Sequence, residues 1–249
     1  MQLKNMENHE VYTEASNSGV KSKDRVKKHG EVFTPDSIVN DMLDLVDVEL
    51  EKELGIQAGE EITDEKLWDY IHKTYLEPTC GDGNFLVRIL DRKLNAARKL
   101  PESMQEEALI HSIASIYGID IQSDNVEESK ERMRELIKTG KVALLELDSS
   151  IEKNNGYIPF HFVPYTNLSD KTWEVINKIL DYNIQCGNAL KGENVFIKEY
   201  DWTSRKFNTF TLKDIETGNE EPKETSELNS YLDLLNTAQY SDDASFDDF

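Results

Sequence analysis

One stretch of the sequence constrains the fold most: an apolar segment, a turn with two glycines, and a helix that begins at once. It reads TYLEPTCGDGNFLVRILDRKL, from Thr74 to Leu94. The apolar lead-in predicts a short strand, and Gly81 and Gly83 predict a tight turn because glycine tolerates positive φ. The apolar spacing after Asn84 predicts a helix. A strand that turns directly into a helix is typical of a parallel α/β sheet.

Further helices and strands alternate around this turn. Apolar spacing and propensity predict helices near residues 35–50, 64–73, 101–115, 122–140 and 173–181. Thr34 is predicted as the N-cap of the first helix, with Pro35 at its first helical position. Strands are predicted at 116–121 and within 182–190, and a weaker one at 206–214. The chain therefore predicts an α/β fold with a mostly parallel sheet and flanking helices.

Composition limits the classes of protein that the chain can belong to. Hydrophobic residues make up 38 % of the 249 residues, below the roughly 45–50 % of average globular proteins, so a solvated periphery is expected around the core. No apolar run reaches the about 18 residues of a transmembrane helix, and the N-terminus lacks the apolar centre of a secretory signal. Cys80 and Cys186 make no disulfide framework, and no Cys/His cluster has metal-binding spacing. A cytoplasmic location is expected.

Charge is high and unevenly distributed. The formal net charge of -21 argues against a protein that holds nucleic acid by broad charge, because phosphate contacts dominate such binding. Residues 21–30 nevertheless form a basic block, which is either a solvated arm or an arm that contacts phosphate. We expect a mobile N-terminal arm over 1–28, a folded domain over 29–215, and an acidic, partly disordered tail over 216–249.

The glycine turn alone leaves its own role open. In open α/β sheets the ligand site lies at the carboxyl ends of the strands, and glycine lets the backbone approach a ligand closely. The full dinucleotide pattern G-x-G-x-x-G is absent, because Leu86 stands at the position of its third glycine. Glu77, before the turn, suits a ligand with a positive group better than a phosphate. A plain tight turn explains Gly81 and Gly83 equally well.

Polar residues also follow the next two predicted strands. Asp120 can accept hydrogen bonds from the hydroxyls of a ribose, or it can cap the helix that begins near Gln122. Asn188 can hydrogen-bond the edge of an adenine, although a turn residue is the simpler interpretation. Each residue alone is weak, and the interpretation depends on their combination.

In combination, four segments resemble the cofactor motifs of the DNA adenine-N6 methyltransferases, of the kind found as modification subunits of restriction systems. HGEVFTPDSIVNDMLDLV is similar to the N-terminal motif G-x-x-x-T-P, and YLEPTCGDGNFLVRIL to motif I, D/E-P-x-x-G-x-G-x-F/L. IYGIDIQSDNVEESKERM is similar to motif II. NIQCGNAL is similar to motif III, with Asn188 in the place of its Asp. The resemblance covers about residues 30–190 and keeps the order of the motifs.

The resemblance implies a Rossmann-like, S-adenosylmethionine-dependent methyltransferase fold that is incomplete at its C-terminal side. Glu77 would meet positive charge, the turn glycines would face the methionine part, and Asp120 would hold the ribose diol. Ile121 and Asn188 would meet the adenine, and residues 33–35 would close the pocket. The implied cofactor-binding residues are Phe33, Thr34, Pro35, Glu77, Pro78, Gly81, Gly83, Asp120, Ile121 and Asn188.

The motif that carries methyl transfer in this family is not recognisable. That motif, N-P-P-Y or a close variant, binds the target amino group through its Asn and first Pro carbonyl, and its aromatic residue stacks on the flipped base. The sequence contains no Pro-Pro pair, and the expected place after the strand near 206–212 reads KDIE. FVPY, from Phe162 to Tyr165, lacks the Asn and precedes motif III. The residues of catalysis therefore stay unassigned.

Two functions remain open at this stage. One is a DNA adenine methyltransferase of a restriction–modification, phage or mobile-element system, which reaches DNA directly or through a partner subunit that carries the other half of the fold. The other is an inactive S-adenosylmethionine-binding protein that acts through a restriction or defence protein, because an acidic surface can occupy a DNA-binding groove. A merely solvated acidic surface is the simpler interpretation of the charge. No membrane partner is expected.

Overall fold

The computed structural model describes residues 21–57, 61–140, 164–192, 195–218 and 221–236. The predicted arm up to residue 20, the acidic residues 240–249 and the first half of FVPY lie outside these ranges. The described helices are α2 (Lys23–His29), α3 (Asp36–Glu53), α4 (Asp64–His72), α5 (Asn84–Ala97), α6 (Glu102–Ala114), α7 (Ser123–Thr139), α8 (Asp170–Asn183), α9 (Leu212–Glu216) and the 3-10 helix η1 (Tyr231–Asn236). The strands are β1 (Tyr75–Glu77), β2 (Ile116–Asp120), β3 (Ile184–Cys186), β4 (Phe196–Asp201), β5 (Lys206–Thr211) and β6 (Glu224–Glu227).

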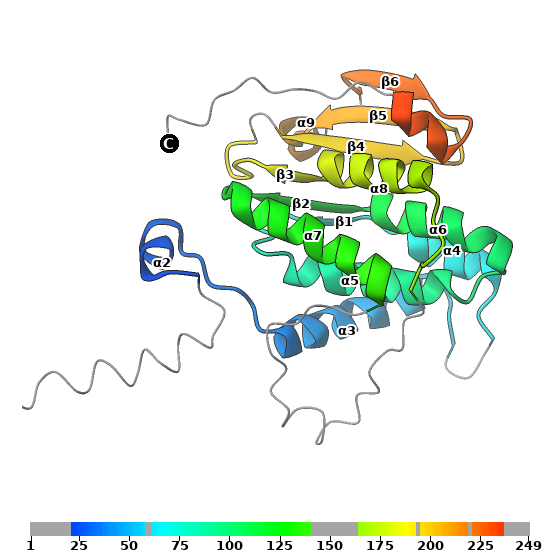
Figure 1. Ribbon diagram of the computed structural model, residues 1–249, viewed down its shortest axis with the longest axis horizontal. Helices are drawn as coiled ribbons and strands as arrows, with labels where there is room; N and C mark the ends of the chain where they lie inside the picture. Colours follow the sequence, from blue (N-terminus) through cyan, green and yellow to red (C-terminus); the bar gives the residue numbers. More distant parts are fainter. Residues whose placement is uncertain (1–20, 58–60, 141–163, 193–194, 219–220, 237–249) are drawn as a thin grey trace, which may run out of the picture.

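The first three strands form a parallel sheet in the order β1-β2-β3 (Figure 1). Its register pairs Tyr75 with Ile116 and Gly118 with Ile184. Helices α5 and α6 connect β1 to β2, and α7 and α8 stand between β2 and β3 in the chain. The predicted α/β fold with parallel strands and flanking helices is confirmed at this level.

The remaining strands form a separate antiparallel sheet in the order β4-β5-β6. The strand predicted near 206–214 exists as β5, but it belongs to this sheet and not to the parallel one. Strand β6 and helix η1 fall within the segment predicted as an acidic tail. Leu228 and Leu234 from that segment are buried in the main core, so the predicted boundary at residue 215 cuts through this unit.

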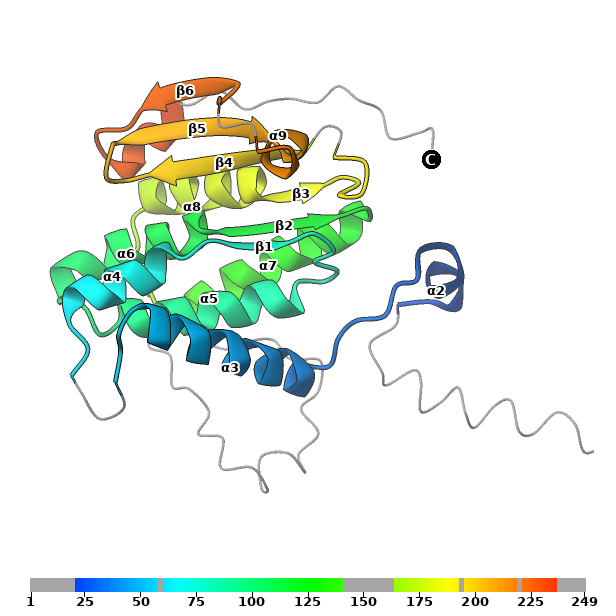
Figure 2. The same ribbon diagram turned by 180° about the vertical axis from the view of Figure 1, so that it is seen from behind.

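The helices cover one face of the parallel sheet. Ile116 and Ile184 pack on that face against α5, α6, α7 and α8. Because side chains alternate along a strand, Tyr117 and Ile119 point to the opposite face. There they meet residues of the β4 and α9 region, including Ile197. In the view from behind, α5, α7 and α8 lie beyond the parallel strands (Figure 2).

Side chains join the two sheets at the seam between β3 and β4. Phe196 N donates to the Oε1 atom of Gln185 at 3.1 Å, and Gln185 Nε2 donates to the carbonyl oxygen of Phe196. The hydroxyl of Tyr117 donates to the carbonyl oxygen of Lys198. The order of strands in each sheet shows no backbone ladder between β3 and β4 among the described residues.

The entry into α3 corrects one prediction. Pro35, not Thr34, is the N-cap, and the helix begins at Asp36. Asn84 Nδ2 donates to the Thr34 carbonyl at 3.0 Å, and Arg88 Nη2 donates to the Asp36 carboxylate at 2.6 Å. These bonds to α5 fix the direction of the chain at the start of α3, which has no side-chain cap. Among the described residues, no helix combines the length and the apolar character that a bilayer crossing requires.

Candidate functional site

The loops that follow the three parallel strands meet at one edge of the sheet. Glu77 is the last residue of β1, Asp120 is the last residue of β2, and Asn188 follows β3 by two residues. Gly187 N donates to the carbonyl oxygen of Asp120 at 2.9 Å, which holds the second and third loops together. The structure therefore brings the predicted acids and the predicted amide to one edge.

A direct hydrogen bond joins the first two loops. Gly81 N donates to Asp120 Oδ2 at 3.0 Å. The other oxygen of Asp120 accepts hydrogen bonds from Gln122 N at 2.8 Å and from Asn125 Nδ2 at 3.2 Å, so this acid also shapes the start of α7. A carboxylate has about four acceptor positions, and three are filled here. The structure leaves about one position at Asp120 for a ligand hydroxyl.

Both turn glycines adopt the left-handed backbone that the sequence predicted. The φ angles are 54° at Gly81 and 89° at Gly83. A Cβ atom at Gly81 would lie 3.0 Å from the ring of Phe33, and one at Gly83 would lie 2.8 Å from Ser129 Oγ. Protein atoms occupy both spaces. Gly83 therefore serves close packing of the turn on α7, and Gly81 serves close packing under Phe33.

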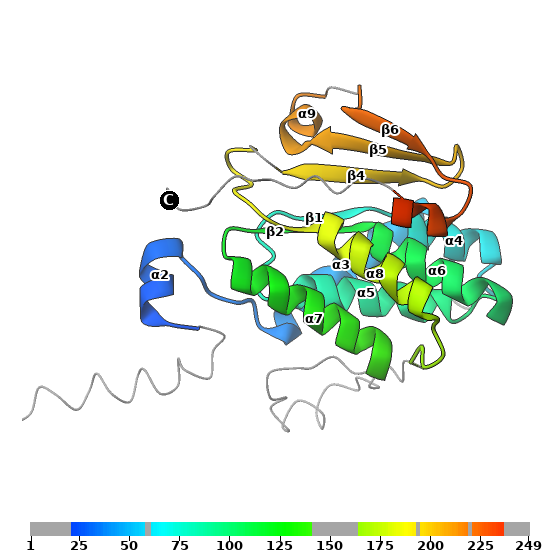
Figure 3. The same cartoon turned by 45° about the horizontal axis from the view of Figure 1, so that its top comes forward.

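The segment 21–35 lies against this edge and against the start of α7 (Figure 3). Arg25 Nη1 donates to Asp124 at 2.5 Å, and Lys21 Nζ lies 2.5 Å from Glu128. The hydrogen bond from Arg25 lowers the pKa of the Asp124 carboxyl to about 2. Part of the basic block is thus bound to acids of α7, and Lys27 and Lys28 are exposed.

Glu31 is a buried acid in this segment that sequence reasoning missed. Its side chain is 7 % exposed, and its Oε2 atom lies 2.6 Å from Arg25 Nη2. The amide of Asn125 donates to both Glu31 Oε2 at 3.3 Å and Asp120 Oδ1 at 3.2 Å. The second oxygen, Oε1, is buried without a hydrogen-bond partner in the described part of the chain. The only sequence signal is an acid that directly follows a basic block.

The predicted residues around this centre keep some hydrogen-bonding capacity. Glu77 Oε1 accepts hydrogen bonds from Thr79 N and Thr79 Oγ1, both at 3.2 Å. Asn188 Oδ1 accepts from the backbone N–H groups of residues 190 and 191, at 3.1 and 3.2 Å, as a turn residue does. The Asn188 amide nitrogen is left to donate. Ile121 is 42 % exposed at the end of β2, and Pro35 and Pro78 are exposed.

A buried ion pair between Asp82 and Arg132 of α7 holds the glycine turn on the side that packs against α7. Asp82 is 1 % exposed, and its Oδ2 atom lies 3.1 Å from Arg132 Nη1. Arg132 also donates to the carbonyl oxygen of Asp82 and to Asn84 Oδ1, both at 2.8 Å. Burial raises the pKa of the Asp82 carboxyl, and the Arg132 charge opposes that rise. This pair holds the backbone between Gly81 and α5 in one conformation.

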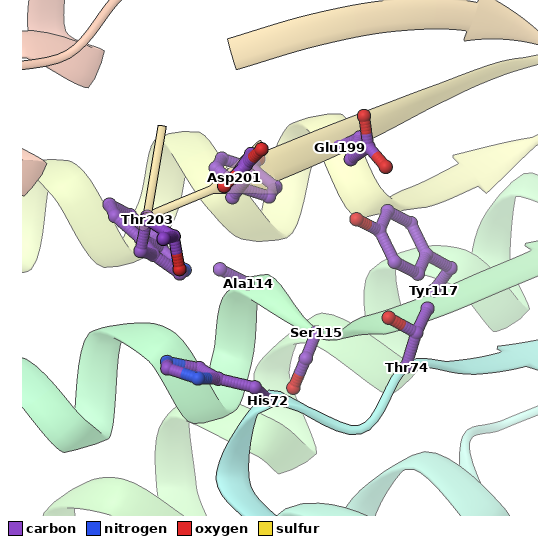
Figure 4. A pocket seen from close by; sticks show the side chains of 10 residues that line it. His72, Thr74, Ala114, Ser115, Tyr117, Glu199, Asp201 and Thr203 are labelled. Atoms are coloured by element: carbon purple, nitrogen blue, oxygen red, sulfur yellow. The ribbon is translucent and has the colours of Figure 1, made fainter. Parts of the chain in front are cut away.

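A hollow of about 270 Å³ opens at the opposite end of the strands (Figure 4). It is lined by His72, Thr74, Ala114, Ser115, Tyr117, Glu199, Tyr200, Asp201, Trp202 and Thr203. His72 Nε2 lies 2.8 Å from His111 Nδ1, and the His111 ring stacks on Trp202 with centroids 3.9 Å apart. Burial and His72 lower the pKa of His111 to about 3. Sequence reasoning did not predict this hollow.

Comparisons with known protein families, with curated proteins and with solved structures give no match. Within the described residues, no group of three or more His, Cys, Asp or Glu side chains is placed to hold a metal ion. The carboxyl edge is therefore characterised by its own geometry. Asn125 bridges the carboxylates of Glu31 and Asp120 beside the left-handed turn, Asn188 keeps an amide donor, and Ile121 is an exposed apolar side chain.

Proposed function

We propose that this chain binds S-adenosylmethionine at the carboxyl edge of β1, β2 and β3, as its resemblance to the adenine methyltransferases implies. The hydrogen bond from Gly81 N to Asp120 carries the proposal. It joins two of the motif-like segments, and the ring of Phe33 from a third segment lies on the same glycine. Three segments that are far apart in the sequence thus converge on one turn.

The residues at this edge fit the chemical groups of the cofactor. S-adenosylmethionine carries an ammonium group, a sulfonium group, a ribose diol and an adenine, and two carboxylates suit its positive charges. The orphaned Oε1 atom of Glu31 is costly when buried, and a donor from a ligand would relieve that cost. The amide nitrogen of Asn188 suits an acceptor nitrogen of adenine, and Ile121 offers the ring an apolar surface.

When bound, the cofactor supplies an electrophilic methyl group, and the chain's own residues bind and orient it. For the acceptor we propose an adenine in DNA, which the chain reaches with a partner subunit. One observation favours the second candidate, an inactive binding protein that acts through a partner. The KDIE segment lies in α9, where Thr211 and Asp214 form a capping box, so this position offers no Asn for a target amino group.

Calorimetry with S-adenosylmethionine tests the binding proposal. We expect one binding site per chain in the wild type, and at least about tenfold weaker binding in Asp120→Ala, because a charge-assisted hydrogen bond to the ligand is lost. Asp41→Asn is the matched control, because Asp41 is exposed on α3. A wild-type chain that gives neither heat nor a thermal shift with the cofactor would refute cofactor binding.

Transfer of a radioactive methyl group to unmodified DNA separates the two candidates. The enzyme candidate predicts transfer by the chain alone or with neighbouring gene products, and loss of transfer in Asp120→Ala. Cofactor binding without transfer under any of these conditions supports the inactive binding protein. A co-purified restriction or defence protein would then identify the partner.

A further inference from the structure

We infer that the open edge of β1 and the hollow beside it form a docking site for an extended segment of a partner polypeptide, which carries a basic side chain. This docking site lies at the amino-terminal end of the strands, whereas the proposed cofactor site lies at their carboxyl ends. The inference does not depend on cofactor binding. It rests on an unpaired strand edge, an uncovered sheet face and the charge of the hollow.

The first observation is the unpaired edge. Within the described residues, β1 pairs with β2 on one side and with no strand on the other. Tyr75 N donates to the carbonyl oxygen of Ser115 at 2.9 Å, so the alternation of a parallel ladder turns the N–H and C=O of Leu76 away from β2. Such an edge is a template for strand addition by another chain.

The second observation is the uncovered face. Parallel sheets are normally covered on both faces. Leu76 and Tyr117 are register partners and point to the face opposite the helices. Tyr117 is 4 % exposed and Ile119 is 1 % exposed under β4 and α9, whereas Leu76 is 43 % exposed. The cover provided by the second sheet therefore ends before it reaches β1.

The third observation is the charge of the hollow that adjoins this edge. Thr74 of the strand entry, Tyr117 and Glu199 line it one above another (Figure 4). Glu199 and Asp201 bring two carboxylates, which also accept hydrogen bonds from Asn208 and Ser204. Among the described residues, no Lys or Arg lines the hollow. A Lys or Arg side chain lays its apolar stem on aromatic rings and directs its charge to carboxylates. Trp202, which is only partly buried, provides such a ring in the wall of the hollow.

The same charges argue against a second copy of this chain as the occupant. A copy that pairs through its own β1 would bring Glu77 and a chain of net charge -21 to a surface that is already acidic. Like charges placed opposite each other destabilise strand pairing. A segment with alternating apolar and basic residues would instead cover Leu76 and complement Glu199 and Asp201.

Hydrogen exchange on the free full-length chain gives the first test. We expect the amide of Leu76 to exchange much faster than the amide of Tyr75, which donates to Ser115 directly before β2. Equal protection of the two amides in a monomeric chain would mean that this chain's own segments cover the edge, and would overturn the inference. Sedimentation shows whether the chain is monomeric, and a dimer that Leu76→Pro dissociates would also overturn it.

Selection from a displayed library of random ten-residue peptides gives the second test. We expect selected peptides to carry Lys or Arg between apolar residues and to protect the Leu76 amide. Leu76→Pro removes the outward N–H, which an edge strand tolerates, and should weaken peptide binding at least about tenfold. Leu76→Val is the matched control that keeps the N–H and should bind normally.

Two further variants test the docking site if Leu76→Pro fails to fold. Glu199→Gln and Asp201→Asn should each weaken binding of the basic peptides and leave S-adenosylmethionine binding unchanged. Peptides that bind all variants as tightly as the wild type, or selected peptides without basic residues, would refute the docking site. A chain that fails to bind the cofactor but binds these peptides would refute only the proposed function.

Discussion

The backbone N–H of Gly81, in the turn after β1, donates at 3.0 Å to the carboxylate of Asp120, the last residue of β2. This bond makes one acid serve the turn after β1 and the start of α7 together. We expect Asp120→Asn to lower the free energy of unfolding by about 1–3 kcal/mol, because an amide cannot replace all three accepted bonds. Urea titration measures the loss, with Asp41→Asn as the control. An unchanged midpoint would show that the bond contributes nothing to stability.

The two left-handed glycines at positions 81 and 30 give a matched pair of substitutions. A Cβ at Gly30 meets no atom within 4 Å, whereas one at Gly81 lies 3.0 Å from the Phe33 ring. Gly30→Ala should cost about 1 kcal/mol from the backbone alone. Gly81→Ala should cost about 1–3 kcal/mol more, because Phe33 must move.

A double-mutant cycle between Gly81 and Phe33 tests whether the ring causes this extra cost. In a Phe33→Ala background, Gly81→Ala should cost only as much as Gly30→Ala, since the clashing ring is gone. Urea denaturation of the four variants measures the coupling. A full cost of Gly81→Ala without the ring would contradict the packing of Phe33 on the turn.

Arg25 is predicted to hold the segment 21–35 in place. Arg25→Gln leaves the buried Glu31 without its cation and removes the bond to Asp124, so the amides of residues 31–34 should exchange faster. Lys171→Gln, an exposed cation at the start of α8, is the control. High salt should act in the same direction as Arg25→Gln, because part of the contact is exposed to solvent. Unchanged exchange in Arg25→Gln would show that the segment is held by other contacts.

His111 should make stability depend on pH. In the folded chain, burial and the neighbouring His72 lower its pKa from the ordinary value of 6.5 to about 3. As pH falls below about 6.5, the unfolded chain takes up a proton that the folded chain refuses, so stability falls by up to about 1.4 kcal/mol per pH unit. The loss ends near the folded pKa.

His111→Phe should flatten this dependence, because the ring can still stack on Trp202 but no longer titrates. Urea midpoints of both proteins between pH 7 and 5, about the range in which histidine dominates, measure the difference. Equal slopes for the two proteins would show that His111 does not account for the acid sensitivity.

Strand β4 shows why part of the fold escaped sequence reasoning. Its sequence FIKEYD does not form an apolar run, yet Lys198 is 3 % exposed. The Lys198 ammonium group lies 3.2 Å from Thr209 Oγ1, and burial lowers its pKa to about 8. A buried lysine looks like a surface residue in a sequence. The parallel strands β1, β2 and β3 were predictable because they are short apolar runs next to glycine turns and helix starts.

The candidate site also contains residues that the sequence predicted and residues that it did not. Asp120 and Asn188 were predictable because residues that end parallel strands meet at one edge. A turn role was predicted as the simpler interpretation of Asn188, and its side chain does accept from the turn that follows. A role at the start of α7 was the open alternative for Asp120, and its carboxylate does accept from Gln122 N, although it is not the N-cap. Glu31 and Asn125 were not predictable, because they meet across 94 residues of chain. Binding of S-adenosylmethionine at this edge stays a prediction, which the calorimetric titration tests.

At the seam between the two sheets, the side-chain amide of Gln185 makes the hydrogen bonds that a backbone peptide group would make. It accepts from the N–H of Phe196 and donates to its carbonyl, which are the two bonds that a neighbouring strand would make. Only Asn and Gln carry the planar amide of a peptide group on a side chain, and Asn is one methylene shorter. Together with the Tyr117 hydroxyl and the apolar contacts around Ile197, the side-chain torsions of this glutamine therefore help to set how the second sheet sits on the first.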